Sequence, residues 1–437
     1  MTSVGTLVAS ASIGVTLYPQ PREVEPEQLL RQADQAVYHA KIAGKDRYHV
    51  FDLDHDEHSR TRYGRLDDVR RGLEAGEFVL HYQPQVDLAT GALLGFEALA
   101  RWQHPERGLL GPGEFIPFLE GDPLAIDFGD WVIGAALDQL ATWNAAGFDT
   151  VVSVNVDSTQ LHHPGFLERL RRHLDARPDV DAAQLAIEIL ETGVLEDLEH
   201  VADLVARLSR LGVATALDDF GTGYSSLTLL KRLRADFIKI DRSFVLDLLT
   251  DPEHAVIVSS IVGLAESFGC TVVAEGLETD IHGELLRELG CTAAQGFGIA
   301  RPMPLEAVDD WLASWRPPPS WSAVGRVDPA GMAGLYAEFE HRAWLHALTE
   351  VLAGVEPARP SVPEQECGLS RWLADAEQEL AAIAEDHHAV HKAGCDALAA
   401  DDDAERAALL EALRSHSEQM LTALRAWRRQ SPGSDPA

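Results

Sequence analysis

The chain has 437 residues, which is too long for a single hydrophobic core and predicts two or three domains. Its 70 acidic and 36 basic residues give a net charge of −34, so its overall field repels nucleic acids and anionic membranes. The four cysteines are scattered, no apolar run is long enough to cross a bilayer, and no signal peptide opens the sequence. Composition therefore argues against disulfide-stapled, membrane-spanning and nucleic-acid-binding classes, and it predicts a cytoplasmic protein.

Residues 1–52 predict a small unit of two strands and one helix. SASIGVTLYP alternates like a strand, EQLLRQADQAVYHAKIAG carries one apolar stripe and a glycine stop, and RYHVF is a short strand. So few residues can hardly bury a core of their own, and we interpret the unit as part of a larger domain. The charged residues 53–71 predict a linker helix.

Residues 72–315 alternate short hydrophobic runs with helical stretches, which predicts parallel strands covered on both faces and closed into an α/β barrel. Polar residues recur at the ends of these runs: Glu97, Arg101, Asn155, Glu188, Glu191, Asp218, Asp219, Lys239, Glu275, Glu278 and Gln295. The carboxyl ends of barrel strands meet at one face, and carboxylates crowded there raise each other's pKa unless cations accompany them. The pattern indicates a metal-dependent enzyme.

Hard divalent cations prefer oxygen ligands, so the acids of this region predict a pair of Mg²⁺ or Mn²⁺ sites. Two overlapping ligand sets are expected: Glu97, Asn155, Glu188 and Asp218 for one ion, and Asp218, Asp219 and Glu275 for the other. Lys239 is expected to position a water or to neutralise charge in the transition state. Taken singly, each residue has a plainer interpretation: a solvated strand end, a turn for Asn155, or an ion pair between Asp219 and Lys239.

Six motifs in this region resemble the EAL domain, the family of cyclic di-GMP phosphodiesterases. They are EALARW (97–102), SVNV (153–156), DDFGTGYSSL (218–227), IKID (238–241), AEGLET (274–279) and QGFGIARPM (295–303). The resemblance implies a TIM-type barrel with one antiparallel strand, hydrolysis of cyclic di-GMP to linear pGpG by two metal ions, and a homodimer through this domain. It also implies catalytic roles for Lys239, Glu275 and Gln295, and contact of Arg101 with a substrate phosphate.

The segment DDFGTGYSSL carries Gly221 and Gly223, which give its backbone conformational freedom. In the resembled family this loop couples dimerisation to activity, and the resemblance implies that Glu191 and Glu278 take part. Leu190 stands where the family usually has a threonine, so one hydroxyl that supports the loop is missing here. The alternative is an ordinary turn between a strand and a helix.

The unit 1–52 resembles the last third of a GGDEF domain, the diguanylate cyclase family. The GGDEF sequence itself does not occur, so cyclic di-GMP synthesis is not expected. On this interpretation Met1 lies inside a domain, and sensory or membrane regions could precede it. The alternative is an unrelated helix–strand adaptor.

The remaining sequence predicts a helical domain behind a break. Residues 316–327 are a proline-rich linker, residues 328–429 are rich in Ala, Leu and Glu without a convincing strand, and residues 430–437 are an expected disordered tail. Residues 355–366 are expected to interrupt the helices as a loop.

Four potential zinc ligands lie in this helical segment: His341, Cys367, His387 and His391. His387 and His391 share one helical face, and three imidazoles with one thiolate suit tetrahedral Zn²⁺. The pattern resembles the chemoreceptor zinc-binding (CZB) domain, although Ser370 replaces a glycine and the Cys-to-His spacing is short. His346 and His388 are competing candidates, and a bundle with surface histidines is the plainer alternative. A zinc-bound Cys367 would also be open to oxidants, which suggests zinc or redox regulation.

Two rival functions come from other classes. A cyclic di-GMP receptor that binds without hydrolysis is expected to have lost Glu97, Lys239 or Glu275, and all three are present. A zinc- or redox-responsive scaffold with a vestigial barrel is disfavoured for the same reason.

Overall fold

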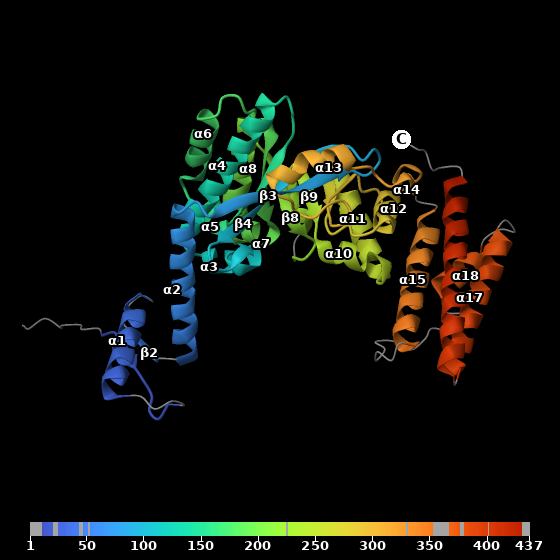
Figure 1. Ribbon diagram of the computed structural model, residues 1–437, viewed down its shortest axis with the longest axis horizontal. Helices are drawn as coiled ribbons and strands as arrows, with labels where there is room; N and C mark the ends of the chain where they lie inside the picture. The colour runs from blue at the N-terminus through green and yellow to red at the C-terminus, as the bar shows by residue number, and fades with distance from the viewer. Residues whose placement is uncertain are drawn as a thin grey trace, which may run out of the picture.

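The computed structural model describes residues 11–20, 25–42, 47–50, 53–223, 226–328, 331–352, 367–375, 380–400 and 402–430. Along the chain these residues form an N-terminal unit, a long helix, a barrel and a helical bundle (Figure 1). None of the helices in these ranges is both long enough and apolar enough to cross a membrane.

The N-terminal unit consists of β1 (Ile13–Val15), α1 (Pro26–Ile42) and β2 (Tyr48–Val50), in the order that the sequence predicts. The two strands pair in parallel, and such a pair requires a crossover, which α1 supplies. Helix α2 (Leu53–Glu74) covers the expected linker helix 53–71 and continues for three more residues to the barrel.

Eight of the described strands close into a barrel, and one of them runs against the rest. The strands are β3 (Phe78–Asp87), β4 (Leu93–His104), β6 (Val152–Val156), β7 (Leu185–Leu190), β8 (Ala214–Phe220), β9 (Phe237–Ile240), β10 (Thr271–Ala274) and β11 (Ala293–Ala294). β3 is antiparallel to both of its neighbours, β4 and β11, whereas the other neighbouring strands pair in parallel. The prediction of a TIM-type barrel with one antiparallel strand is confirmed. The short strand β5 (Gly108–Leu110) extends β4 as a hairpin.

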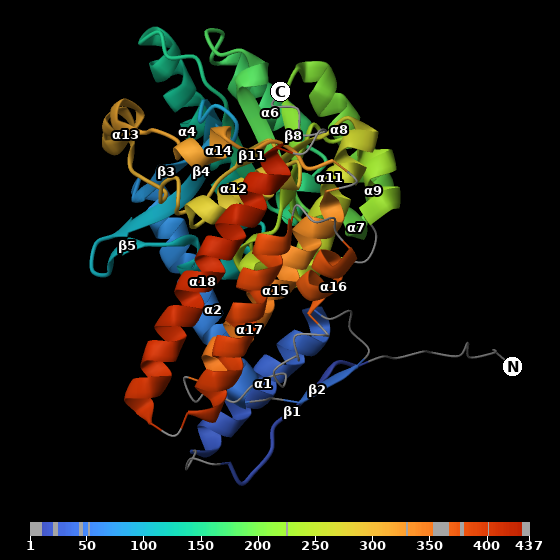
Figure 2. The same cartoon turned by 90° about the vertical axis from the view of Figure 1, so that its right-hand side faces the viewer.

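Helices cover the outside of the barrel (Figures 1 and 2). The larger ones are α4 (Leu124–Ala145), α6 (Phe166–Asp175), α8 (Leu198–Leu211), α9 (Ser226–Leu233), α11 (Pro252–Phe268), α12 (Asp280–Glu288) and α13 (Val308–Ser314), and the shorter ones are α3 (Ile116–Leu119), α5 (Ser158–Leu161), α7 (Glu191–Glu196) and α10 (Arg242–Leu246). Helix α8 shows why they pack as they do. Its Val201, Leu204, Val205 and Leu208 share one face and are buried, and the left-handed Gly212 ends it.

The C-terminal bundle consists of α15 (Met332–Leu352), α16 (Gly368–Asp375), α17 (Ala381–Ala399) and α18 (Asp403–Gln430). No strand occurs among its described residues, in agreement with the sequence. The predicted loop 355–366 and residues 431–437 of the predicted tail lie outside the described residues, while Gln430 still belongs to α18.

The segment 316–327 differs from the simple linker that its prolines predict, because it is docked on the barrel. It contains α14 (Pro319–Ser322), whose Trp321 is buried and donates from Nε1 to the Asp280 carbonyl oxygen at 2.9 Å. The ring packs so closely against Gly283 that a Cβ there would meet it at 2.3 Å. The bundle is therefore attached to α12 through a fixed segment.

Candidate active site at the barrel mouth

Polar side chains from seven neighbouring strands converge at one mouth of the barrel. They are Glu97 on β4, Asn155 on β6, Glu188 on β7, Asp218 on β8, Lys239 on β9, Glu275 directly after β10 and Gln295 directly after β11. Parallel pairing sets Asn155 beside Glu188 and Lys239 beside Val273, two residues before Glu275. The barrel thus brings together the residues that the sequence predicts as one site.

Lys239 lies at the centre of this group and is almost completely buried. Its Nζ is 2.6 Å from Glu275 Oε1, 2.7 Å from Glu188 Oε2, 3.1 Å from Asp218 Oδ1 and 3.4 Å from Glu97 Oε2. When all four carboxylates are ionised, the one ammonium leaves three negative charges uncompensated in a region of low polarity. Buried charge of this kind requires further partners, which favours binding of cations.

Two amide side chains hold the carboxylates in place, and a third orients one of these two. Asn155 Nδ2 donates to Glu97 Oε1 at 2.7 Å, and Gln295 Nε2 donates to Glu97 Oε2 at 2.6 Å and to Glu275 Oε1 at 3.1 Å. The amide of Gln295 is oriented in turn by Gln85, whose Nε2 donates to Gln295 Oε1 at 2.9 Å. Sequence reasoning missed Gln85, because it lies on the antiparallel strand β3 and in no motif at a strand end.

Burial shifts the pKa values of the acids at the barrel mouth. Burial raises the pKa of Glu275 to about 8 and that of Asp219 to about 6, and it raises the pKa values of Glu188 and Asp218 as well. For Glu97, burial is outweighed by Lys239 and by the amides of Gln295 and Asn155, so its pKa is lowered. Without metal, the acids with raised pKa values release their protons less readily than free carboxylates, and a bound cation would oppose this effect.

Asp218, Asp219 and Glu275 form a compact oxygen cluster, with one oxygen of each lying within 4.8 Å of the others. Asp219 has a φ of +53°, an uncommon conformation for a residue with a side chain, and its backbone N–H donates to Asp218 Oδ1 at 3.0 Å. The three residues are the set expected for the second ion. Their oxygen-only chemistry fits Mg²⁺ or Mn²⁺.

The loop after β8 is held by Glu191. Its Oε2 accepts from the backbone N–H of Gly221 at 3.1 Å and of Gly223 at 3.3 Å. Gly221 has a φ of +104°, and a Cβ at Gly223 would lie 2.5 Å from Glu191 Oε1. Both glycines are therefore required for this contact, whereas the neighbouring Leu190 is 42% exposed and lies beside Asp218 in the sheet.

Arg101 and Glu278 lie at the edge of the group rather than within it. Arg101 is partly buried and donates from Nη1 to the Ala100 carbonyl oxygen at 2.9 Å, while Glu97 acts on it electrostatically. Glu278 is exposed, one residue before Thr279, the N-cap of α12. Arg101 is thus available to an anionic ligand at the mouth, and Glu278 faces solvent.

A cavity of about 250 Å³ adjoins the metal-ligand candidates, with Asn155 in its wall. Its lining is mainly apolar and includes Leu99, Phe128 and Val132. Gln160 also lines it and is 1% exposed, and within the described residues neither its Oε1 nor its Nε2 has a hydrogen-bond partner. The cavity therefore offers apolar walls and a buried amide to a flat polar ligand.

A second group of potential metal ligands lies in the bundle. His341 on α15, Cys367 just before α16, and His387 and His391 on α17 are all buried, and one ligand atom of each lies within 4.8 Å of the others. Cys367 Sγ is 3.6 Å from His387 Nε2, and the buried His341 Nδ1 has no hydrogen-bond partner among the described residues. Burial and the neighbouring imidazoles lower the pKa of His341, and they lower that of His387 to about 3. Neutral imidazoles with a thiolate fit Zn²⁺.

The structure brings the four zinc candidates together, and two tryptophans of the bundle differ in their position relative to them. The Trp344 ring packs against the His391 ring, with centroids 3.9 Å apart and the planes tilted by 33°. Trp372 packs instead on Trp427, with centroids 5.5 Å apart, and the cluster of ligand atoms includes neither His346 nor His388.

Comparison with known proteins assigns the barrel. Residues 66–302 match the EAL domain family. The chain is 41% identical over 298 residues to the bifunctional diguanylate cyclase/cyclic di-GMP phosphodiesterase MucR of Pseudomonas aeruginosa. The aligned region covers 68% of this chain and 43% of MucR. It is 35% identical over 312 residues to the cyclic di-GMP phosphodiesterase NbdA of the same organism, covering 71% of this chain and 40% of NbdA. The chain thus spans less than half the length of either relative.

The fold of this chain is also similar to that of a solved structure. The phosphodiesterase of MucR in complex with cyclic di-GMP shares 41% identity with this chain at a TM-score of 0.54, covering 56% of this chain and 99% of that one.

Proposed function

Because the chain belongs to the EAL domain family, we propose that it hydrolyses cyclic di-GMP to linear pGpG with two divalent cations, Mg²⁺ or Mn²⁺. The observation that carries this proposal is the group of four carboxylates gathered around Lys239 at one mouth of the barrel. A receptor without catalysis would not need this excess of buried negative charge.

The ligand sets follow from the geometry of the mouth. Glu97, Asn155, Glu188 and Asp218 would hold one ion, and Asp218, Asp219 and Glu275 the other. Once bound, the two ions supply a water of lowered pKa and polarise the phosphodiester oxygens. The surrounding side chains would position the substrate, balance the charge of the site and exclude bulk water.

Lys239 and Gln295 would act as fixed donors in this reaction. The ammonium of Lys239 lowers the pKa values of neighbouring carboxylates, against the opposite effect of their burial, and it offers a hydrogen bond to a water or to a phosphate oxygen. Gln295 holds Glu97 and Glu275 in place together, so the two carboxylates cannot turn away independently. Arg101 would bind a substrate phosphate at the rim, and the adjacent cavity would take one guanine base against Leu99, Phe128 and Val132.

The test is a turnover assay with the purified chain, cyclic di-GMP and Mg²⁺ or Mn²⁺, with pGpG measured by chromatography. Glu97→Ala should abolish hydrolysis while circular dichroism shows a folded protein. The exposed Glu106→Ala, in the turn between β4 and β5, is the control and should retain the wild-type rate. Wild-type turnover by Glu97→Ala would refute the metal assignment, and binding of cyclic di-GMP without pGpG would favour the receptor function.

A second function is favoured by the bundle, which we propose binds one structural or sensory Zn²⁺ through His341, Cys367, His387 and His391, as the CZB resemblance implies. The convergence of four buried ligand types suited to zinc supports it. Metal analysis should find about one zinc per chain, and His387→Ala and His391→Ala should each remove it. The exposed Cys395→Ala is a matched control that should leave zinc bound. A wild-type chain that binds no zinc would end this proposal.

Two further expectations remain proposals. The parallel strands and crossover helix of the N-terminal unit suit a GGDEF remnant, which has no catalytic motif here. Pairing of two copies through the EAL barrel, with Glu191, Gly221, Gly223 and Glu278 linking it to activity, would give a dimer in sedimentation experiments.

A further inference from the structure

Helix α15 belongs to the barrel and to the bundle at the same time. Its Leu335 and Phe339, four residues apart on one face, pack into the core of the barrel, whereas Ala337 packs with α16 and α18. Tyr336 strengthens the first contact, because its hydroxyl lies 2.7 Å from Ser259 Oγ of α11. In Figure 1 the helix accordingly stands between the barrel helices and the rest of the bundle.

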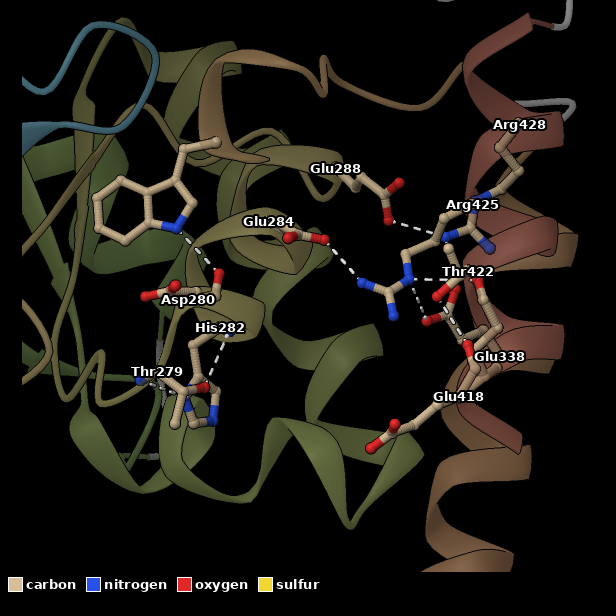
Figure 3. Close-up of polar contacts among 12 residues, drawn as sticks. Thr279, Asp280, His282, Glu284, Glu288, Glu338, Glu418, Thr422, Arg425 and Arg428 are labelled. Atoms are coloured by element: carbon tan, nitrogen blue, oxygen red, sulfur yellow. Dashed lines mark hydrogen bonds and ion pairs between the residues drawn. The ribbon is translucent and has the colours of Figure 1, made fainter. Parts of the chain in front are cut away.

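A buried network of ion pairs joins α15 and α18 to α12 of the barrel (Figure 3). Glu338 of α15 is fully buried, and its Oε2 is 2.6 Å from Arg428 of α18. Arg428 also lies 2.9 Å from Glu288 of α12, and Arg425 lies 2.7 Å from Glu284 of the same helix. Arg342 completes the set at 2.8 Å from Glu338, so three guanidinium groups balance three carboxylates.

Such a network fixes the relative positions of the three helices. Arg428 bridges Glu288 and Glu338 within the same buried space, so neither helix can shift without breaking a charge-assisted hydrogen bond. Removal of one partner leaves an uncompensated charge in the interior, which is strongly unfavourable. The bundle is therefore attached to α12 by contacts that depend on geometry, in addition to apolar packing.

One helix of this network, α15, also carries a zinc candidate, His341. His341 follows Glu338 by three residues on α15, which places the two on adjacent turns of one side of the helix. His341 Nε2 is 3.4 Å from Ser417 Oγ of α18, and Ser417 precedes Arg425 by two helical turns. Movement of His341 toward a bound ion would thus shift α15 against α18, two helical turns from the residues of α18 that contact α12.

At its other end, α12 leads directly to the active site. The helix begins after the N-cap Thr279, whose side chain and His282 form a reciprocal cap. Two residues earlier, the Leu277 backbone N–H donates to the Gln295 carbonyl oxygen at 3.1 Å, and its carbonyl accepts from Gly298 at 2.8 Å. Glu275, the ligand candidate that touches Lys239, lies only four residues before Thr279. A displacement of α12 would be transmitted to Glu275 and Gln295 through this short, hydrogen-bonded segment.

We propose that the ion-pair network of α12, α15 and α18 couples metal occupancy of the His341–Cys367–His387–His391 cluster to the position of Glu275. This inference rests on the proposed phosphodiesterase function and zinc site, and it assigns the route between them. Glu284, Glu288, Arg425 and Arg428 are positioning residues in this mechanism, since they act through α12 and do not touch the substrate.

The test is hydrogen–deuterium exchange of the full chain at saturating Mg²⁺, with and without one equivalent of Zn²⁺. Zinc should slow exchange of the α12 amides by threefold or more, and it should change kcat by a similar factor while KM changes less than twofold. Glu284→Gln should still bind zinc but lose both responses. Asp130→Asn breaks an ion pair with Arg169 between α4 and α6, away from the bundle, and should retain both responses.

Two further variants make the outcome decisive. A chain with His387→Ala and His391→Ala should show no zinc response, which excludes zinc acting at the barrel mouth. If Glu284→Gln does not fold, Arg425→Lys takes its place, because it keeps the charge and loses the forked contact.

An α12 that is unaffected when zinc binds the wild-type chain would overturn the inference, as would a full response in the folded interface variant or a chain that does not bind zinc. An α12 response that requires Glu284, in a chain that never hydrolyses cyclic di-GMP, would support the coupling and refute the proposed reaction instead.

Discussion

Replacement of Lys239 by methionine isolates the charge balance of the barrel mouth. The substitution keeps the unbranched, apolar part of the side chain and removes the ammonium that lies within 3.4 Å of Glu97, Glu188, Asp218 and Glu275. Breaking a buried ion pair by removing one partner costs about 3–5 kcal/mol. For a domain of this size each kcal/mol lowers Tm by about 2–4 °C, so the metal-free variant should melt about 6–20 °C below the wild type.

Divalent cations should change this result in a specific way. Mg²⁺ or Mn²⁺ at 100 times its Kd stabilises a folded protein by about 2.7 kcal/mol, and the variant, with more uncompensated charge, should gain at least as much as the wild type. Turnover should still fall about 10²–10³-fold, because a donor aimed at the reacting group is missing.

The assay is thermal unfolding followed by circular dichroism, in EDTA and in saturating Mg²⁺, together with turnover of cyclic di-GMP. Lys231→Met, the same substitution at an exposed position of α9, is the matched control and should change Tm and turnover little. A Lys239→Met protein as stable as the wild type in EDTA would refute the reasoning, since it would show that the carboxylates do not depend on this ammonium.

Three other changes test separate parts of the structure. Arg101→Ala should raise KM about tenfold or more with a smaller effect on kcat, and a decrease in kcat alone would contradict its assignment to substrate binding. Gly223→Ala forces a Cβ against Glu191 and should lower kcat by disturbing the loop, whereas the solvent-facing Gly113→Ala should not; equal rates in both variants would remove the loop from the mechanism. Burial raises the pKa of Glu288 to about 7, and pairing with Arg428 offsets this only in part. Between about pH 4.5 and 7 the carboxyl therefore keeps its proton in the folded state and has lost it in the unfolded state. Stability should therefore fall as pH rises through this window, and Glu288→Gln should flatten that decrease in Tm measured against pH; an unchanged slope would contradict the burial of a carboxylate there.

Much of the barrel and its chemistry could be predicted from local sequence. Strand-length hydrophobic runs alternating with helical stretches indicate parallel strands joined by helices, because each pattern has its own period, and the resemblance to the EAL domain implies their closure into a barrel. A polar residue at the end of each run, from Glu97 to Gln295, then predicts one site, since parallel strands end at the same face. His387 and His391 could likewise be paired from their spacing on one helix.

Other features depend on contacts between distant residues and could not be predicted in this way. Gln85 reaches Gln295 only because β3 runs against its neighbours and closes the barrel. Nothing in the sequence distinguishes Arg428 from the exposed arginines of the helices, since its burial depends on how α18 is rotated toward α12 and α15. The prolines of the segment 316–327 likewise predict a spacer, whereas in the structure Trp321 packs on Gly283.

The sequence by itself determined which chemical groups stand at the strand ends and on each helical face, because periodicity is a local property of the chain. Only the tertiary structure decided which charged groups are buried together and which carboxylates the Lys239 ammonium contacts. It also decided that ion pairs join the bundle to α12. These are long-range packing outcomes, and their energies depend on burial, which no short stretch of sequence specifies.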